Sequence, residues 1–465
     1  MAFLRRLYAP EFLVPDSKRQ GELPKTSSAY GSVVRLAWPA LTEMVLVTMI
    51  NMVDTMMVSV LGHRAIAAVG VVHQPRFVVL AAFMAIGTSV TAIVARRRGE
   101  KNSQGANDCM LNGFAISAVL AIVISAASYI FARQFLYMAG ANNEIIDDAT
   151  AYFRFLLIGI PFNALALIIT AAQRGAGNTK ISMQINLLAN LVNVVFNYLL
   201  IEGKFGFPRL EVSGAAIATT IGYTVAFFAA LLSLKKPEGF LSIYKIKFKL
   251  DRAILKTIYK IGSSAAVEQL CVRIGFLLYA RLVAGLGTES LATHQICLNL
   301  NFFFAIAAGF EIAATTLVGQ NLGAKRVDLA TLYIKVCQRV ALCITSGIAI
   351  LYILTGRSLI SMFSGEQSII SLGATILIIM AATSPFQVSQ VIISGSLRGA
   401  GDTKFVAAVS FISIMALRPV VAWFLAYPLG LGLVGAWLSM TIDILIRIAL
   451  TYARMHTGKW TKIKV

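Results

Sequence analysis

One acidic side chain lies deep inside a long apolar block near the start of the chain. Asp54 belongs to the segment 34–60, and no lysine or arginine lies within one helical turn of it. An ionised group in the hydrocarbon core of a bilayer costs at least ~2.5 kcal/mol. Such a carboxyl group should therefore bind a cation or hold a proton. We predict that Asp54 exchanges one of these ions, and a structural hydrogen bond is the alternative.

Amide side chains recur at helical spacing in a second apolar block. Asn190, Asn193 and Asn197 are spaced i, i+3 and i+7, so they share one face of a helix. Amide oxygens are neutral, hard ligands of the kind that small hard cations accept. We predict a Na⁺ site formed by Asn193, Asn197 and Asp54, and helix packing is the alternative for the amides.

Three glutamates occupy other apolar blocks. Glu43 and Glu268 are 225 positions apart, and Glu311 follows in a later block. We predict that Glu268 is a second cation-coupling residue and that Glu43 and Glu311 face a substrate cavity. Ion pairs are the alternatives, Glu268 with Arg273 and Glu311 with Arg418.

Other polar groups in the apolar blocks are interpreted as structural. Asp443 and Arg447 are spaced i, i+4, which predicts an ion pair on one helix. We expect Arg76, next to Pro75, to be hydrogen-bonded rather than functional. The 5 cysteines include no CxxC pair or Cys/His cluster, so they predict neither a disulfide framework nor a metal site.

A seven-residue motif occurs twice in the chain. RGAGNTK at 174–180 and RGAGDTK at 398–404 differ at one position and are 224 positions apart. The same offset relates Gly99-Glu100-Lys101 to Gly323-Ala324-Lys325. Internal duplication of membrane spans is typical of transporters. Because glycine permits tight turns, we expect both motifs to be cytoplasmic pivots.

The composition is that of a polytopic membrane protein. The chain is 58% hydrophobic and only 13% charged, with a mean hydropathy of +0.77. The apolar blocks reach the roughly 20 residues that a spanning helix needs, and they are too continuous for barrel strands. We predict an all-α fold with twelve membrane-spanning helices at 34–60, 66–94, 109–132, 149–172, 181–202, 212–234, 254–282, 288–318, 330–355, 369–395, 405–427 and 431–453.

Basic residues in the connecting segments predict the orientation. With both termini inside, 25 lysines and arginines are cytoplasmic and 5 lie on the opposite side. This asymmetry favours a multi-pass protein of the inner (plasma) membrane with cytoplasmic termini. It also accounts for the net charge of +20 without a nucleic-acid partner, because the basic residues form no continuous face.

The longest polar connection divides the chain into two predicted lobes. We expect helices 1–6 in an N-lobe (34–234), a cytoplasmic linker (235–253) and helices 7–12 in a C-lobe (254–453). An N-terminal segment (1–33) and a basic tail (454–465) flank the lobes. The N-terminal segment should either lie in the membrane interface or form a disordered tail.

The ordered series of motifs resembles the MATE (multidrug and toxic compound extrusion) family in its bacterial branch. Matching pieces occur through nearly the whole chain. They are MVDTMMV at 52–58, QRGAGNTK at 173–180, the asparagines of the segment 181–202, GAAIAT at 214–219, ATTLVGQNLGA at 314–324 and GSLRGAGDT at 395–403.

The resemblance implies two six-helix lobes around a central cavity. It implies export of organic, often cationic, compounds in exchange for H⁺ or Na⁺, with no other cofactor, by a functional monomer. It adds Thr219, which matches the family's helix 6 threonine, to the coupling residues and supports Glu268. Some relatives have an aspartate at the position of Asn197, and some sodium-coupled relatives have one at the position of Gln387. Gln387 therefore stays only a candidate for the substrate cavity.

Other functions remain as alternatives. A lipid-linked precursor flippase of related architecture would need a strongly basic cavity, which the acids Asp54, Glu268 and Glu311 disfavour. An intramembrane enzyme would need a catalytic pattern such as HExxH, which is absent from the sequence. We therefore expect no enzymatic activity.

Overall fold

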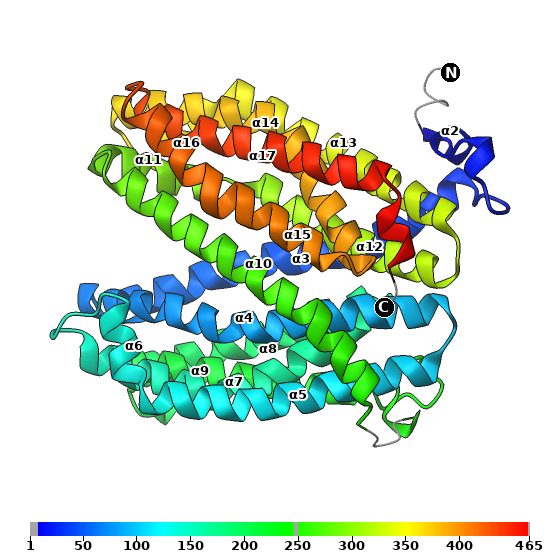
Figure 1. Cartoon of the computed structure of the whole chain (residues 1–465). Coiled ribbons are helices and arrows are strands. Elements are labelled where there is room, and N and C mark those ends of the chain that lie inside the picture. The colour runs from blue at the N-terminus through cyan, green and yellow to red at the C-terminus, as the bar shows by residue number, and fades with distance from the viewer. Residues whose placement is uncertain (1–7, 246–249, 464–465) are drawn as a thin grey trace. The chain divides into compact units, whose positions relative to one another are not determined.

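The computed structural model describes residues 8–245 and 250–463, and at Asn51 only the backbone (Figure 1). Twelve helices or helix pairs in this part are long and apolar enough to cross a membrane, which confirms the predicted all-α class and span number. Their bounds are α3 Thr26–Ser59, α4 His63–Gly99, α5 Ser103–Ile130, α7 Ile146–Gly175, α8 Thr179–Glu202, α9 Glu211–Leu232, α10 Arg252–Ala284, α11 Thr288–Asn299 with α12 Phe302–Gly323, α13 Val327–Ser361, α14 Gln367–Gly399, α15 Thr403–Ser410 with α16 Arg418–Ala426, and α17 Gly432–His456.

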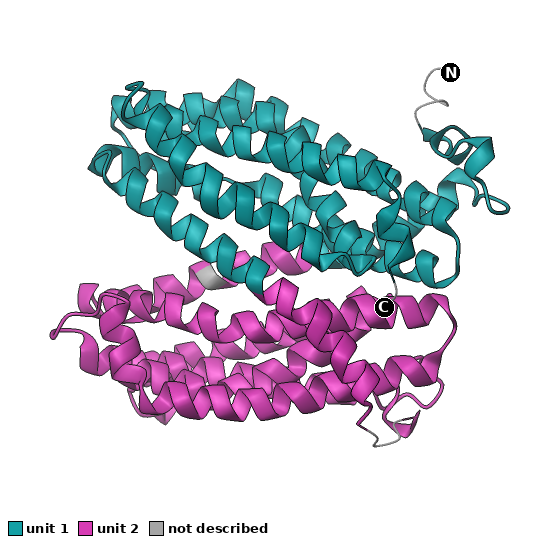
Figure 2. Cartoon of the chain, in the orientation of Figure 1, with its two compact units in different colours: residues 1–41, 267–465 teal, residues 42–266 magenta. Residues whose placement is uncertain are grey.

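The chain forms two compact units, residues 1–41 with 267–465 (unit 1) and residues 42–266 (unit 2), coloured separately in Figure 2. The change from one unit to the other falls inside α3 and inside α10. The predicted lobes, 34–234 and 254–453, remain a prediction, and the units differ from them in the first parts of these two helices.

Large apolar side chains form the interior of each unit. In unit 2, Phe83 of α4 and Phe153 of α7 are fully buried in one apolar cluster. In unit 1, Phe310 of α12 and Phe303 of the same helix belong to two separate clusters. This packing fixes the helices that carry the polar residues.

The predicted span 288–318 falls within one apolar span, Thr288–Gly323, but that span is not one continuous helix. It consists of α11 and α12, which are interrupted at Leu300 and Asn301. The hydroxyl group of Tyr352 on α13 donates to the carbonyl oxygen of Leu300, so a backbone group freed by the interruption is satisfied inside the protein.

The two copies of the repeat share unusual backbone conformations. Gly177 and Gly401 of the repeated motif have φ of 93° and 88°. Lys101 and Lys325, also 224 positions apart, have φ of 57° and 59°. A left-handed conformation is costly for a residue with a Cβ atom, so its presence in both copies shows that the duplication preserved local geometry.

The copies also share a contact between neighbouring helices. Thr91 Oγ1 of α4 donates to Ala171 O of α7 (2.9 Å) in unit 2. In unit 1, Thr315 Oγ1 of α12 donates to Gly395 O of α14 (2.8 Å). These equivalent bonds hold the helix that precedes each motif against its neighbour.

A π-helix at Phe411–Leu417 joins α15 to α16 and distinguishes the second copy. At the repeated motif shortly before it the copies are 224 positions apart, whereas Leu200 and Leu425 beyond it are 225 apart and make equivalent contacts. A methyl group on Gly214 would lie 2.6 Å from Leu200 O, and one on Gly435 would lie 2.7 Å from Leu425 O. The π-helical turn therefore takes up one extra residue.

The N-terminal segment packs on unit 1 from residue 9 onward. Leu13, which ends the short helix α2 (Pro10–Leu13), is only 2% exposed. Lys335 Nζ donates to Leu13 O (2.8 Å), and Gln20 N donates to Asp328 Oδ2 (3.1 Å). The expectation of a disordered tail is wrong for these residues. Helix α3 already begins at Thr26, inside the segment assigned to the N-terminus.

The linker and the basic tail also make ordered contacts. Asn107 Oδ1 of α5 accepts a hydrogen bond from Ser242 N (2.9 Å), and Arg454 Nε donates to Asp402 Oδ2 (2.7 Å). Trp460 in the tail is 3% exposed. The basic residues counted for orientation include Arg5, Arg6, Lys247, Lys249 and Lys464, which lie outside the described residues.

Candidate cation-coupling site

The structure brings together four of the predicted coupling residues in unit 2. Asp54 of α3 accepts a hydrogen bond from Asn197 Nδ2 of α8 (2.7 Å). Asn193, one turn earlier on α8, lies 3.1 Å from both carboxylate oxygens of Asp54 and 3.2 Å from Thr219 Oγ1 of α9. We call these four residues the Asp54 cluster. Their convergence was predicted, whereas their coupling role remains a prediction.

Hydrogen bonding assigns the orientation of the Asn193 amide. With its nitrogen toward Asp54 it donates to the carboxylate, and its oxygen faces Thr219 Oγ1 and N (3.2 and 3.1 Å). Thr219 Oγ1 also donates to Ala215 O of its own helix (2.9 Å). The amides of α8 thus stabilise the ionised form of Asp54 without supplying a charge.

The cluster offers oxygen atoms that suit a small cation. Asn197 is 2% exposed, and its Oδ1 atom accepts no hydrogen bond within the described part of the chain. A buried amide oxygen without a donor is costly, and a bound Na⁺ would satisfy it. A proton on Asp54 would instead neutralise the carboxylate. The residues present therefore fit either ion.

A basic residue near Asp54 was missed by sequence spacing. Arg76 of α4 is close enough for its charge to interact with that of Asp54. Its Nη2 donates to the hydroxyl group of Tyr223 on α9, and its guanidinium carbon is 5.6 Å from the Tyr223 ring centroid. The sequence correctly indicates that no lysine or arginine lies within one helical turn of Asp54 on α3, but spacing along α3 does not reveal a cation on another helix.

The acids of unit 1 are joined by an arginine of the repeated motif. Arg398 Nη2 lies 2.7 Å from Glu268 Oε1 and its Nε lies 3.3 Å from Oε2, a bidentate pair. Arg398 Nη1 also contacts Glu311 Oε1. The alternative of an ion pair was thus right in kind but wrong in partner, because Arg398 takes the place of Arg273 at Glu268 and of Arg418 at Glu311. A loop-proximal arginine was not expected to reach into the helices.

A second ionic group in unit 1 lies almost entirely away from solvent. Asp443 Oδ2 is 3.0 Å from Arg447 Nη2, which confirms the predicted ion pair. Arg418 Nε donates to the same oxygen (3.1 Å), and Ser413 Oγ contacts Asp443 Oδ1. Arg418 is 225 positions after Asn193, so the second copy has a cation where the first has an amide.

The remaining candidates do not join these groups. Glu43 is 6% exposed and accepts a hydrogen bond from Asn186 Nδ2 (2.6 Å) within unit 2. Gln387 is half-buried in α14. Their predicted place in a substrate cavity remains a prediction.

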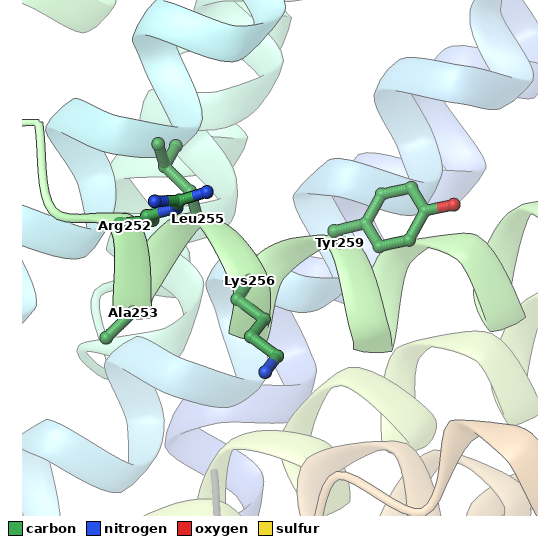
Figure 3. Close-up of a pocket in the computed structure, with 5 residues that line it drawn as sticks. All are labelled: Arg252, Ala253, Leu255, Lys256 and Tyr259. Carbon is green, nitrogen blue, oxygen red and sulfur yellow. The ribbon is translucent and has the colours of Figure 1, made fainter.

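An open concavity of about 750 Å³ lies along the first turns of α10, where Figure 3 shows its side chains. It is lined by Arg252, Ala253, Leu255, Lys256 and Tyr259. No candidate coupling residue lines it. Among the described residues, no three His, Cys, Asp or Glu side chains are grouped as a metal site would need.

Comparison with known families decides the family. The family model described as MatE matches the chain twice, at residues 39–199 and 264–424. The chain belongs to the MatE family. The two matched segments begin 225 positions apart, which agrees with the internal repeat. Asp54, Asn193 and Asn197 lie in the first segment, and Glu268 and Glu311 lie in the second.

Relatives of the chain extend over nearly its full length. The "Uncharacterized transporter YisQ" of Bacillus subtilis (strain 168) is 28% identical, covering 94% of this chain and 96% of its own. The "Probable multidrug resistance protein NorM" of Thermotoga maritima is 27% identical, covering 98% and 96%.

Solved MATE structures share the fold. A MATE in the straight conformation matches with a TM-score of 0.85 at 21% identity, covering 94% of this chain and 97% of that chain. A MATE in the bent conformation gives a TM-score of 0.85 at 22% identity, covering 93% and 96%.

Proposed function

We propose that this MatE-family protein is a secondary active multidrug efflux antiporter. It exports organic, often cationic, compounds in exchange for H⁺ or Na⁺ by alternating access, with no other cofactor and as a functional monomer. It spans the inner membrane twelve times with both termini cytoplasmic. The family membership supports transport, and the name of the Thermotoga relative supports multidrug compounds as substrates.

The Asp54 cluster is the observation that carries the coupling mechanism. Its carboxylate is surrounded by neutral hydrogen-bonding groups of α8 and α9, so an incoming cation or proton meets an acid that no arginine of the described residues contacts directly. The half-buried position of Asp54 in a membrane span makes the empty, charged site costly, which favours exchange of the ion for a change of conformation. Pro39 in α3 precedes the boundary between the units by two residues and is a suitable position for a bend.

The acids of unit 1 are less suitable for coupling. Both oxygens of Glu268 are occupied by Arg398, which already acts as their cation. A Na⁺ ion would have to displace a bidentate guanidinium group from a buried carboxylate. We therefore assign the coupling ion to unit 2.

Efflux from proteoliposomes with an imposed Na⁺ or H⁺ gradient tests the proposal. The wild type should export a cationic dye when the gradient of its coupling ion, Na⁺ or H⁺, is imposed. Asp54→Asn keeps the shape and hydrogen-bonding capacity but removes the exchangeable charge, so coupled efflux should fall at least about tenfold.

Glu268→Gln is the matched variant in unit 1. We expect it to retain the cation dependence of the wild type, even where total activity falls through the lost ion pair. Full coupled efflux by Asp54→Asn would show that Asp54 is not the coupling site. An absence of gradient-driven dye efflux by the wild type would contradict the proposed function.

A further inference from the structure

Arg76 is held beside the Asp54 cluster by a neutral partner. Its side chain donates to the Tyr223 hydroxyl group and lies against the Tyr223 ring. The charge of Arg76 interacts with Asp54 and also with the phenol of Tyr152 on α7. An arginine in a membrane helix marks a functional position by default, because its burial is costly.

The geometry of α9 places Arg76 close to Asp54 without direct contact. Tyr223 is four residues after Thr219, so the two side chains share one face and are about 6 Å apart along the helix. Thr219 lies next to Asn193, which lies next to Asp54. Tyr223 therefore holds the guanidinium group about one helical turn from the Asp54 cluster.

We propose that Arg76 is a tethered counter-cation for Asp54. While H⁺ or Na⁺ occupies the Asp54 cluster, Tyr223 holds Arg76 away from the carboxylate. When the ion leaves, the guanidinium group moves onto Asp54 and neutralises it until the next ion arrives. Arg76 is thus a positioning residue, and the inference rests on the proposed coupling role of Asp54.

Two physical consequences follow from a cation fixed near the site. The positive charge of Arg76 opposes binding of a second cation, which lowers the affinity of the Asp54 cluster for the coupling ion. The same charge stabilises the carboxylate after the ion has left. Release of a tightly held ion, which could otherwise limit turnover, becomes easier.

The groups around Asp54 allow the pH response of Asp54 to be distinguished from that of other residues. Asn193 and Asn197 of α8 and Thr219 of α9 do not titrate, and the charged and phenolic groups that face the site are Arg76, Tyr152 and Tyr223. His73, on α4 three residues before Arg76, packs edge-on against Phe77 with ring centroids 4.7 Å apart. A His73→Gln background therefore serves as a control for histidine titration.

Variants of Arg76 and Tyr223 test the inference in proteoliposomes loaded with a cationic dye. The readouts are the pH midpoint of efflux without Na⁺ and the half-saturating Na⁺ concentration at fixed pH. Arg76→Gln should bind the coupling ion more tightly, shifting the pH midpoint upward by about one unit or the Na⁺ requirement downward about tenfold. Tyr223→Phe, which frees Arg76 to approach Asp54, should shift the same readout in the opposite direction.

Arg76→Lys retains the charge, so its pH midpoint and Na⁺ requirement should stay near those of the wild type. If Arg76→Gln fails to fold, Arg76→Lys and Tyr223→Phe together test the inference. In the Asp54→Asn background, neither substitution should shift the readout. Shifts of the same sign in Arg76→Gln and Tyr223→Phe, or no shift in either, would overturn the inference. A wild type without coupled efflux would instead overturn the proposed function.

Discussion

The two copies of the repeat differ in their polar interiors far more than in their backbones. Each copy has the threonine-to-carbonyl bond between neighbouring helices, at Thr91 and at Thr315. Unit 2 surrounds Asp54 with amides, whereas unit 1 binds Asp443 between two arginines. The duplication thus retained a packing framework and changed the chemistry inside it. One copy surrounds its acid with neutral groups, and the other pairs its acids with arginines.

A single position illustrates the divergence. Asn193 of the first copy contacts Asp54, and its counterpart Arg418 contacts Asp443. The exchange of an amide for a guanidinium group converts a neutral ligand into a fixed cation. The fixed charge of Arg418 would repel a cation at the second position, whereas Asn193 adds no charge at the first.

The largest expected effect comes from removing the charge of Asp443 in unit 1. Asp443→Asn would leave Arg418 and Arg447 buried without their counter-charge, so we expect about 3–5 kcal/mol of destabilisation. Asp54→Asn should change stability much less, because its hydrogen-bonding partners are neutral. Thermal unfolding in detergent, monitored by size-exclusion chromatography, measures both. Equal loss of stability in the two variants would break the contrast between the copies.

A smaller loss of stability, similar in the two copies, is expected where neighbouring helices pack closely at a glycine. A methyl group on Gly399 would lie 2.3 Å from Thr315 O, and one on Gly175 would lie 2.6 Å from Thr91 O. Gly399→Ala and Gly175→Ala should each destabilise by roughly 1–3 kcal/mol.

Gly87→Ala is the matched control for these glycines, since its methyl group would meet Leu167 Cδ2, the movable end of a side chain, at 2.7 Å. The same thermal unfolding assay should show a smaller loss for it. A loss as large as that of Gly399→Ala would show that backbone contact is not what limits these positions.

The smallest expected effect is a stabilisation at the two left-handed lysines. Lys101→Gly and Lys325→Gly should each raise stability by about 1 kcal/mol or less, since glycine adopts this conformation without a steric cost. Both lysines are exposed, so little packing is lost. Lys→Ala at each position should give no gain. A gain in one copy only would show that the backbones are less alike than their φ angles indicate.

Sequence patterns predicted what depends on local periodicity. Apolar length predicted twelve spans, and the spacing of Asn193 and Asn197 predicted a shared face that the structure turns toward Asp54. Thr219 came from the family resemblance alone. These successes share a cause, because helical spacing determines which side chains lie on one face.

The unpredicted contacts all involve long side chains or neighbouring helices. Arg398 follows a span end in the sequence but reaches back to Glu268 and Glu311, and Arg76 approaches Asp54 from another helix. Residues far apart in sequence meet only through tertiary packing, which spacing along one helix does not encode. The interruption at Leu300 was missed for a similar reason, since Tyr352 of α13 satisfies its carbonyl group.

The π-helix at Phe411–Leu417 bears on how the second copy could evolve. Inserting one residue into a regular α-helix rotates everything beyond it by about 100°. Such a rotation would carry Leu425 away from Gly435. A locally widened turn absorbs the insertion and leaves the downstream face in register. Deleting one residue from this turn should therefore be tolerated better than deleting one from α8, which has no widened turn to absorb the change.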